Sequence, residues 1–295
     1  MKIYHTGLRL IEKQLTALPH DITQRILKRL ESIIDYDPVI GIMGKTGVGK
    51  SSLCNALFKA ELSPVSDIES CTREAQRFNL TWGHRTLTLI DLPGVGESQS
   101  RDDEYRELYS QVLPTVDLVI WVLKADDRAF SSDEYFYQHI IEQCQCDPRK
   151  VLFVLNQADK IEPYREWDTV NNQPSFHQYQ NLESKIQAIS ECFNYPCHPI
   201  IPISAKDNYN LAAFVETLMG SLPKQASSAM TTQLKERYKT DVVIEKAQSD
   251  FGDSVDELLE SMIQSASLPQ VFTFLIIKVK EAIISAMKSL WSFFF

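Results

Sequence analysis

Short apolar runs alternate with polar stretches of helix length through the middle of this chain. The runs occupy residues 38–43, 87–90, 116–123, 151–155 and 199–203. Uninterrupted apolar runs are typical of strands buried on both faces, and their alternation with helical segments predicts a parallel sheet with helices on both sides. In residues 73–84 the pattern changes. Phe78, Leu80 and Trp82 alternate with polar neighbours there, which predicts a half-exposed edge strand. We therefore expect an α/β, doubly wound, mostly parallel six-stranded sheet with one antiparallel edge strand.

Helices are expected on both sides of these strands in the sequence. One should follow Lys50, and two more should cover residues 133–144 and 209–222. Residues 8–34 also carry apolar side chains at helical spacing, with a break near Pro19. This spacing predicts one or two amphipathic helices before the first strand.

The C-terminal region begins with a change in composition. Residues 223–230 are small and polar, which predicts a linker after the last helix of the central region. A helical tail follows it. We therefore expect an N-terminal helical extension of residues 1–36, a central domain of residues 37–223 and a C-terminal helical extension of residues 224–295.

The tail has one apolar helical face, and charged residues interrupt it as a membrane-spanning segment. The face consists of Phe272, Leu275, Ile276, Val279, Ile283, Met287, Leu290 and Phe294. The interrupting residues are Lys278, Lys280, Glu281 and Lys288. Two interpretations stay open: the face packs against residues 8–34, or its lysines and aromatic residues make it an amphipathic helix that contacts a membrane surface.

Composition and charge narrow the classes of function. Hydrophobic residues make up 44% and charged residues 23% of the chain, which is ordinary for a globular protein. A formal net charge of -9 argues against a broad nucleic-acid-binding surface. The six cysteines lack zinc-ligand spacing, and the first ten residues lack the features of a secretory leader. We expect a cytoplasmic protein, peripheral at the membrane if the tail contacts it.

A phosphate-binding motif follows the first predicted strand. It reads Gly44-Lys45-Thr46-Gly47-Val48-Gly49-Lys50-Ser51, with Ser52 next. This is the P-loop pattern, in which glycines let backbone amides curl around phosphate oxygens. Lys50 is expected to reach the β- and γ-phosphates and to act in catalysis, while the Ser51 hydroxyl coordinates Mg²⁺. The helix that follows presents the partial positive charge of its N-terminus to the polyphosphate.

Two further segments complete the expected magnesium and γ-phosphate site. Asp91 ends a predicted strand and begins the run Asp91-Leu92-Pro93-Gly94. Its carboxylate can hold Mg²⁺ through water, and the Gly94 amide can meet the γ-phosphate. Thr72, between the P-loop and the edge strand, is the candidate switch residue whose hydroxyl completes the metal shell. We therefore expect Ser51, Thr72 and Asp91 as metal ligands and Thr72 and Gly94 as catalytic residues.

The nucleobase is predicted from two motifs that follow strands. These are Asn156-Gln157-Ala158-Asp159 and Ser204-Ala205-Lys206. Nucleotides bind at the carboxyl ends of such strands. Asp159 can accept hydrogen bonds from guanine N1-H and the exocyclic amine, a donor pair that adenine lacks. Asn156 would brace neighbouring loops, the Ala205 amide could donate to guanine O6, and Lys206 would help to cover the base.

In this order and spacing the motifs resemble those of the Era-like branch of TRAFAC-class bacterial P-loop GTPases, across about residues 38–222. The stretch Asp126-Asp127-Arg128-Ala129 and the region of Trp167 are similar to small GTPases carried on mobile elements, whose physiological roles are poorly defined. The resemblance implies GTP and GDP as ligands, Mg²⁺ as cofactor and GTP hydrolysis as the reaction.

Three residues depart from the pattern of the family. Gln157 stands where the guanine motif usually has lysine, so an ammonium is lost and the affinity for the base is expected to fall. Gly47 stands where potassium-dependent relatives have asparagine, so potassium stimulation is not implied. Val95 stands where some small GTPases have a glutamine that positions water, and valine cannot hydrogen-bond to that water.

Two functions are consistent with these residues. The first is a slow GTPase that acts as a nucleotide-dependent switch. The second is a GTP-dependent binding module that does not hydrolyse GTP and acts through its terminal helices on a protein or membrane partner. An ATPase is the third alternative, and the assignment of Asp159 disfavours it. Candidate partners are GTP, a protein effector, a membrane surface and a second copy of the chain across the nucleotide face. Arg128 would act in trans in such a homodimer, or form a structural salt bridge.

Overall fold

The fold is described from a computed structural model. It describes residues 2–16, 18–59, 63–64, 76–82, 85–92, 102–264 and 270–295. The chain divides into two compact units. We call one the helical unit, and it comprises Met1–Asp37, Pro223–Thr232 and Lys239–Phe295. The other is the sheet unit, with Pro38–Leu222 and Gln233–Tyr238.

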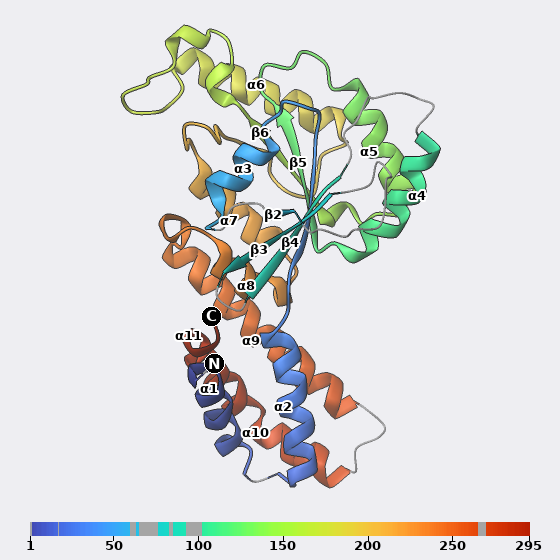
Figure 1. Cartoon of the computed structure of the whole chain (residues 1–295), viewed down its shortest axis with the longest axis vertical. Helices are drawn as coiled ribbons and strands as arrows, with labels where there is room; N and C mark the ends of the chain where they lie inside the picture. The colour runs from blue at the N-terminus through green and yellow to red at the C-terminus, as the bar shows by residue number, and fades with distance from the viewer. Residues whose placement is uncertain are drawn as a thin grey trace. The chain divides into compact units, whose positions relative to one another are not determined.

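A mostly parallel sheet forms the centre of the sheet unit (Figure 1). Within the described residues it has seven strands in the order β2-β3-β4-β1-β5-β6-β7. Their bounds are β1 Val39–Met43, β2 Ser63–Pro64, β3 Gln76–Trp82, β4 Arg85–Asp91, β5 Leu118–Lys124, β6 Val151–Asn156 and β7 Ile201–Pro202. β4, β1, β5, β6 and β7 run parallel, whereas β3 is antiparallel to β4.

This topology confirms the predicted doubly wound α/β fold with its antiparallel strand. The structure adds β2, a two-residue strand that pairs with β3 through Ser63 and Pro64. β3 is therefore covered on its outer edge over those two pairs. So short a strand gives almost no periodicity, which is why the sequence pattern did not indicate it.

Helices cover both faces of the sheet. Figure 1 shows α3 and α7 on one side of the strands and α4 and α5 on the other. The α-helices are α3 Lys50–Leu57, α4 Asp102–Val112, α5 Ser131–Gln143, α6 Phe176–Cys192 and α7 Leu211–Ser221. The 3₁₀ turns are η2 Leu113–Thr115, η3 Pro148–Lys150, η4 Ala158–Lys160, η5 Tyr164–Glu166 and η6 Glu236–Tyr238. Helix α6 begins at a reciprocal capping box in which Ser175 and Gln178 bond to each other's backbone amides.

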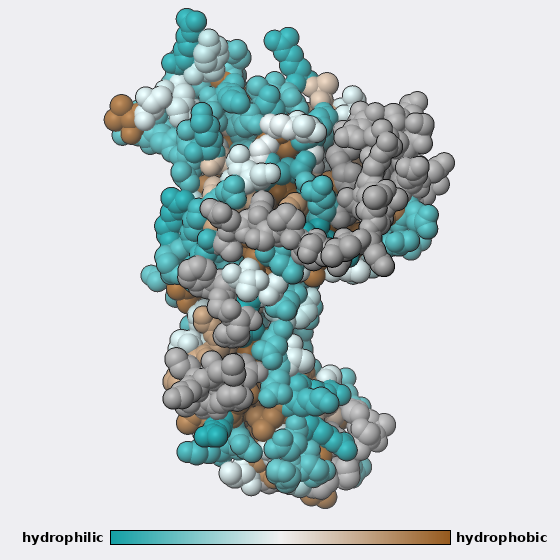
Figure 2. Space-filling model, in the orientation of Figure 1, coloured by the Kyte–Doolittle hydropathy of each residue, from teal (hydrophilic) through white to brown (hydrophobic). Residues whose placement is uncertain are grey.

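The core beneath α4, α5 and α6 is rich in aromatic residues. Trp121 of β5 and Phe153 of β6 lie against Phe193, and the Phe153 and Phe193 ring centroids are 4.4 Å apart. Tyr137 of α5 meets Phe153 edge to face at 5.3 Å. These apolar strands are buried, and the face in Figure 2 shows mainly hydrophilic residues with scattered hydrophobic ones. This packing holds the strand ends that carry the polar motifs in fixed positions.

The helical unit is formed by segments from both ends of the chain. Its α-helices are α1 Lys2–Gln14, α2 His20–Ile34, α8 Lys224–Gln233, α9 Asp241–Gln264, α10 Gln270–Ser289 and α11 Trp291–Phe294. Helix α1 packs on α10 and α11, and α2 packs on α9. The apolar face of α10 buries Ile276, Ile283 and Met287. Of the two interpretations of this face, the contacts agree with packing: α10 packs on α1, and it also packs on α9.

The predicted linker at residues 223–230 was wrong, because helix α8 occupies most of this stretch. Ala226, Ala229 and Met230 are buried in it. Its hydroxyl groups have partners: Ser227 donates to Asp250 Oδ2 at 2.6 Å, and Ser228 accepts from Trp291 Nε1 at 2.9 Å. Small residues allow close helix packing, and satisfied hydroxyls remove the desolvation penalty. Small and hydroxyl-bearing residues are also typical of linkers, so the composition of this stretch does not distinguish a packed helix from a linker.

None of the helices in the described part of the chain is long and apolar enough to cross a membrane.

Candidate nucleotide-binding site

Residues 44–49 form a glycine-dependent loop between β1 and α3. Gly44 has φ +137°, and a Cβ there would lie 2.3 Å from the Val122 carbonyl oxygen. Gly49 has φ +96°, and a Cβ there would lie 2.4 Å from Asn156 Nδ2. Positive φ and these close approaches exclude side chains at both positions. The loop can therefore turn its backbone toward the cavity beside it.

This cavity has a volume of about 570 Å³ and lies where four strands end. It is lined by Lys45, Thr46, Gly47, Gly49, Lys50, Ser51, Ser52, Asp91, Asn156, Gln157, Asp159, Lys160 and Lys206. The structure thus brings together residues of the P-loop, of the end of β4 and of both predicted base motifs. Gly44, Val48, Ser204 and Ala205 are buried next to these residues and are not part of the lining. Lys160 belongs to the lining, and the sequence motifs did not indicate it.

Lys50 and Asp91 face each other in the cavity. Lys50 Nζ donates to the Gly44 carbonyl at 2.8 Å and lies 3.8 Å from Asp91 Oδ1. Burial raises the pKa of Asp91, and the Lys50 ammonium lowers it in part. Asp91 Oδ1 is a buried oxygen with no hydrogen-bond partner among the described residues. A buried carboxylate oxygen without a hydrogen-bond partner among the described residues, in the same cavity as Ser51, fits the oxygen ligands that Mg²⁺ takes directly or through water.

The side chain of Lys45 is bound to carboxylates rather than free in the cavity. Its ammonium lies 2.6 Å from Asp133 Oδ2 and 4.0 Å from Asp127 Oδ2, and it donates to the Ala129 carbonyl at 3.4 Å. Asp133, buried in the first turn of α5, also accepts a bond from Trp121 Nε1 at 3.3 Å. Lys45 therefore ties the P-loop to the segment after β5.

Asn156, at the end of β6, connects two loops. Its Nδ2 donates to the Val48 carbonyl at 2.8 Å, and its Oδ1 accepts from the Ala205 amide at 3.0 Å. A hydrogen bond from Ala205 to guanine O6 would have to share this amide proton. Ser204 also has internal partners, because its hydroxyl donates to Asp207 Oδ2 at 3.1 Å.

Gln157 has a left-handed backbone, with φ +61°. Its Nε2 donates to the Gly47 carbonyl at 2.8 Å, and its Oε1 accepts from Lys160 Nζ at 2.7 Å. The amide that stands at the position of the usual lysine therefore still reaches the P-loop. Asp159 lies in the same 3₁₀ turn and lines the cavity.

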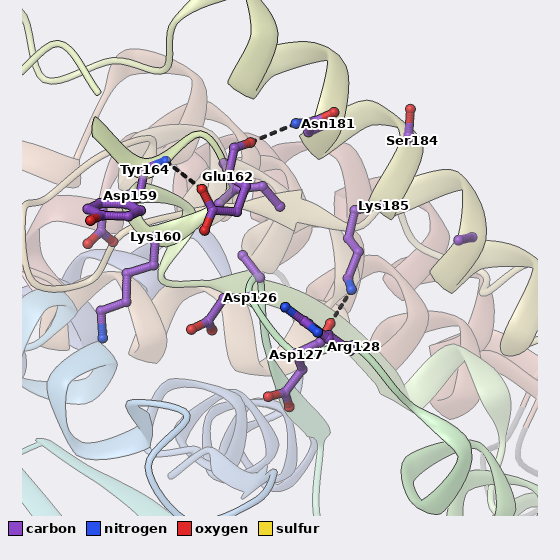
Figure 3. Close-up of a pocket in the computed structure, with 13 residues that line it drawn as sticks. Asp126, Asp127, Arg128, Asp159, Lys160, Glu162, Tyr164, Asn181, Ser184 and Lys185 are labelled. Atoms are coloured by element: carbon purple, nitrogen blue, oxygen red, sulfur yellow. Dashed lines mark hydrogen bonds between the residues drawn. The ribbon is translucent and has the colours of Figure 1, made fainter. Parts of the chain in front are cut away.

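A second cavity, of about 870 Å³, adjoins the first (Figure 3). It shares Asp159 and Lys160 with the first cavity and extends between η5, α6 and the segment after β5. Lys185 of α6 donates to the Asp127 carbonyl in it. Arg128 lines this cavity, and no ion pair of Arg128 is found among the described residues. The predicted residues Thr72 and Gly94, and the substitution at Val95, lie outside the described residues.

The chain is similar to a GTPase family, to two uncharacterized proteins of Escherichia coli and to GTPase Era. The family described as 50S ribosome-binding GTPase matches residues 39–157. The chain is 44% identical to the uncharacterized protein YkfA of Escherichia coli (strain K12), over 98% of both chains. It is 41% identical to YfjP of the same organism, again over 98% of both. GTPase Era of Clostridium perfringens (strain 13 / Type A) is 28% identical over 73% of this chain and 67% of Era. A crystal structure of Era with MgGDPNP and part of 16S ribosomal RNA has 26% identity over 64% of this chain and 58% of that chain, with a TM-score of 0.45.

Proposed function

We propose that this chain, which belongs to the Era-like P-loop GTPases and is 44% and 41% identical to YkfA and YfjP, is a slow, Mg²⁺-dependent GTP hydrolase that works as a nucleotide-dependent switch. One observation carries the proposal. Asp91 ends β4, Lys50 begins α3 after β1, and Asp159 lies in η4 after β6. All three line one cavity of about 570 Å³. A lysine can bind the phosphates, one carboxylate can hold the metal, and the other can accept the two hydrogen bonds that guanine donates.

In this mechanism the side chains position the GTP phosphates and neutralise their negative charge. Lys50 would bind the β- and γ-phosphates and stabilise the charge that develops on the transferred phosphoryl group. Mg²⁺, held by Ser51, Thr72 and Asp91, would supply further neutralisation. Thr72 and the Gly94 amide would contact the γ-phosphate, so that their loops change order when it is released.

Recognition of guanine is assigned to the turn after β6. Asp159 would accept hydrogen bonds from N1-H and the exocyclic amine, and Lys206 would cover the base with Gln157. With adenine the Asp159 carboxylate would lose this donor pair. The Ala205 amide remains the proposed donor to O6, in competition with its present bond to Asn156 Oδ1.

Turnover by the isolated chain is expected to be slow, because Val95 cannot orient the attacking water. We expect a rate of about 10⁻⁴ to 10⁻² per second. The assay is phosphate release from GTP with Mg²⁺. The Lys50→Ala variant should lose the activity, and Lys13→Ala, an exposed position on α1, should keep it. Equal phosphate release from wild type and Lys50→Ala, even at high protein concentration, would rule out catalysis at this site.

The base assignment has its own test. Asp159→Asn should weaken GTP binding and favour xanthine nucleotides, whose C2 oxygen accepts a bond from the asparagine amide. Competition of GTP, ATP and XTP for the same variant would measure the change. An unaltered preference for GTP over XTP would contradict the assigned role of Asp159.

A second function is favoured by an exposed surface on α10. Val271, Phe274 and Ile277 recur at helical spacing and are 69%, 57% and 52% exposed. Lys278 Nζ lies 4.5 Å from the Phe274 ring centroid. Apolar residues beside a lysine suit the interface of an anionic membrane. In this alternative, GTP binding without hydrolysis controls attachment of a cytoplasmic protein to a membrane or to a protein effector.

Vesicle sedimentation would separate the two functions. The chain would be incubated with phosphatidylserine vesicles and either GDP or a non-hydrolysable GTP analogue, and phosphate release from GTP would be followed in parallel. The binding module is supported by nucleotide-dependent retention that Phe274→Ser abolishes, without turnover. Turnover with no retention supports the hydrolase alone.

A further inference from the structure

The 3₁₀ turn η4 places two side chains of the cavity wall next to each other. The Lys160 amide donates to the Gln157 carbonyl at 2.9 Å, which closes the turn. Side chains at positions i and i+3 of a 3₁₀ turn lie one above the other. The Lys160 ammonium accordingly reaches Gln157 Oε1 at 2.7 Å. The pair is therefore set by the backbone of the turn and not by a chance surface contact.

Both the nitrogen and the oxygen of the Gln157 side-chain amide form hydrogen bonds. Its Nε2 donates to the Gly47 carbonyl of the P-loop while its Oε1 accepts from Lys160. An amide has both a donor and an acceptor, whereas an ammonium has donors only. A lysine at position 157 could bind the Gly47 carbonyl, but it would repel Lys160. Glutamine at position 157 and lysine at position 160 therefore suit each other.

Lys160 is one of the few lysines of the cavity wall that can face the negative charge of a bound nucleotide. The Lys45 ammonium is held by Asp133. Among the described lining residues, Lys50, Lys160 and Lys206 then remain to face the negative charge of a bound nucleotide. Lys160 lines both cavities, and Figure 3 shows its side chain extending away from Arg128 and Lys185.

We propose that Gln157 and Lys160 form a two-residue latch in which Gln157 holds the P-loop and Lys160 supplies the positive charge that the base motif lacks at position 157. Lys160 is thus a binding residue for the guanine nucleotide, and Gln157 is its positioning residue. The inference rests on the proposed function, because it concerns how the same cavity holds GDP and GTP. It also revises the expectation that the substitution at position 157 lowers affinity, since the lost ammonium is replaced from one turn away.

A double-mutant cycle tests the latch through binding rather than turnover. The dissociation constant of a fluorescent GDP analogue would be measured with Mg²⁺ for wild type, Lys160→Ala, Gln157→Lys and the double variant. Lys160→Ala should weaken binding about three- to tenfold, as expected for loss of one cation near the nucleotide. Gln157→Lys should bind within about twofold of wild type. In that background Lys160→Ala should cost less than about twofold, because the ammonium introduced by Gln157→Lys then provides the charge.

Controls separate charge from structure. Lys160→Arg should restore binding to within about twofold, and the loss in Lys160→Ala should shrink as salt is raised from about 0.05 M to 0.5 M. The unfolding temperature of ligand-free Lys160→Ala should equal that of the wild type, since Lys160 is exposed. Lys13→Ala should bind like wild type.

The outcomes distinguish this inference from the proposed function. Equal losses for Lys160→Ala in both backgrounds, or an affinity of Lys160→Ala equal to that of wild type, would overturn the latch and leave the site intact. Failure of the wild-type chain to bind GDP at all would overturn the proposed function and the latch with it.

Discussion

Asp91 combines partial burial with a charge that the ligand-free protein does not fully compensate. Its Oδ1 has no hydrogen-bond partner in the described structure, and the nearest cation, Lys50 Nζ, is 3.8 Å away. Burial raises the pKa of its carboxyl group. A folded-state pKa above the unfolded value means that the protonated form favours folding, and this contribution is lost as the pH rises through the folded pKa. At neutral pH the ionised Asp91 therefore lowers stability, as expected of a residue kept for binding.

Asp91→Asn should consequently stabilise the ligand-free protein while it damages the site. Because the side chain is 39% exposed and solvent screens its charge, the unfolding temperature should rise by only about 2 °C at neutral pH. The difference should narrow toward acidic pH, where Asp91 is protonated in both states. Addition of Mg²⁺ and GDP should stabilise wild type more than the variant. Thermal unfolding with and without MgGDP measures both effects, and a lower unfolding temperature of ligand-free Asp91→Asn would contradict the argument.

Lys45 has the opposite role, because its charge is compensated inside the protein. Replacing it with methionine would leave Asp133, which is 1% exposed, without its 2.6 Å ion pair. We expect Lys45→Met to cost about 1–3 kcal/mol of unfolding free energy in urea titration, below the range for fully buried pairs because Lys45 itself is partly exposed. The added change Asp133→Asn should recover part of the loss. A loss confined to GTP affinity, with stability unchanged, would show that Lys45 serves phosphate directly.

At the scale of elements, helix α8 of the helical unit packs through small residues. Helix α8 is buried along Ala226, Ser227 and Ser228, and it carries hydroxyl groups that bond to α9 and α11. Lys246 extends this network from within α9, where it bonds to both oxygens of Asp250. A stretch that looks like a linker by composition is therefore part of the packed interior.

Ala226→Leu tests the close packing of α8. Ala226 is fully buried, so three added carbon atoms have no space, and we expect a loss of about 1–3 kcal/mol in unfolding free energy. Gln225→Leu makes a comparable leucine at the exposed neighbouring position of the same helix and should change stability by less than about 0.5 kcal/mol. If both variants unfold alike in urea, α8 is not packed as described.

At the scale of the whole molecule, we propose that two chains associate across their nucleotide faces. Arg128 lines the cavity beside the nucleotide site and has no ion pair among the described residues. Val95 cannot orient the attacking water, and an arginine provided by a second chain could raise the rate in another way, by stabilising the charge of the transition state.

If two chains pair across their nucleotide faces, the rate of phosphate release per chain should rise with protein concentration. Arg128→Ala should remove that rise and leave GDP affinity within about twofold, because the arginine acts on the transition state of the partner chain. Sedimentation with a non-hydrolysable GTP analogue would show whether dimers form. A rate per chain that is independent of concentration in the wild type would exclude this role of Arg128.

The sequence by itself determined the parts of this protein that depend on local chemistry. Continuous apolar runs specify buried parallel strands, and glycines at 44 and 49 specify a loop that side chains would block. The motifs at 91, 156–159 and 204–206 could be predicted to meet, because parallel strands end at a common edge of the sheet.

Contacts between distant segments were decided only by the tertiary structure. Asp133 lies 88 positions after Lys45 in the sequence, and no local pattern marks it as the partner of the P-loop lysine. The same is true of Trp291 and Ser228, and of β2, which is too short to have a period. Lys160 is close to the base motif in sequence, yet its hydrogen bond to Gln157 could be seen only in the geometry of the 3₁₀ turn. Periodicity and motifs report on a residue and its neighbours along the chain, whereas packing selects among partners that are adjacent only after folding.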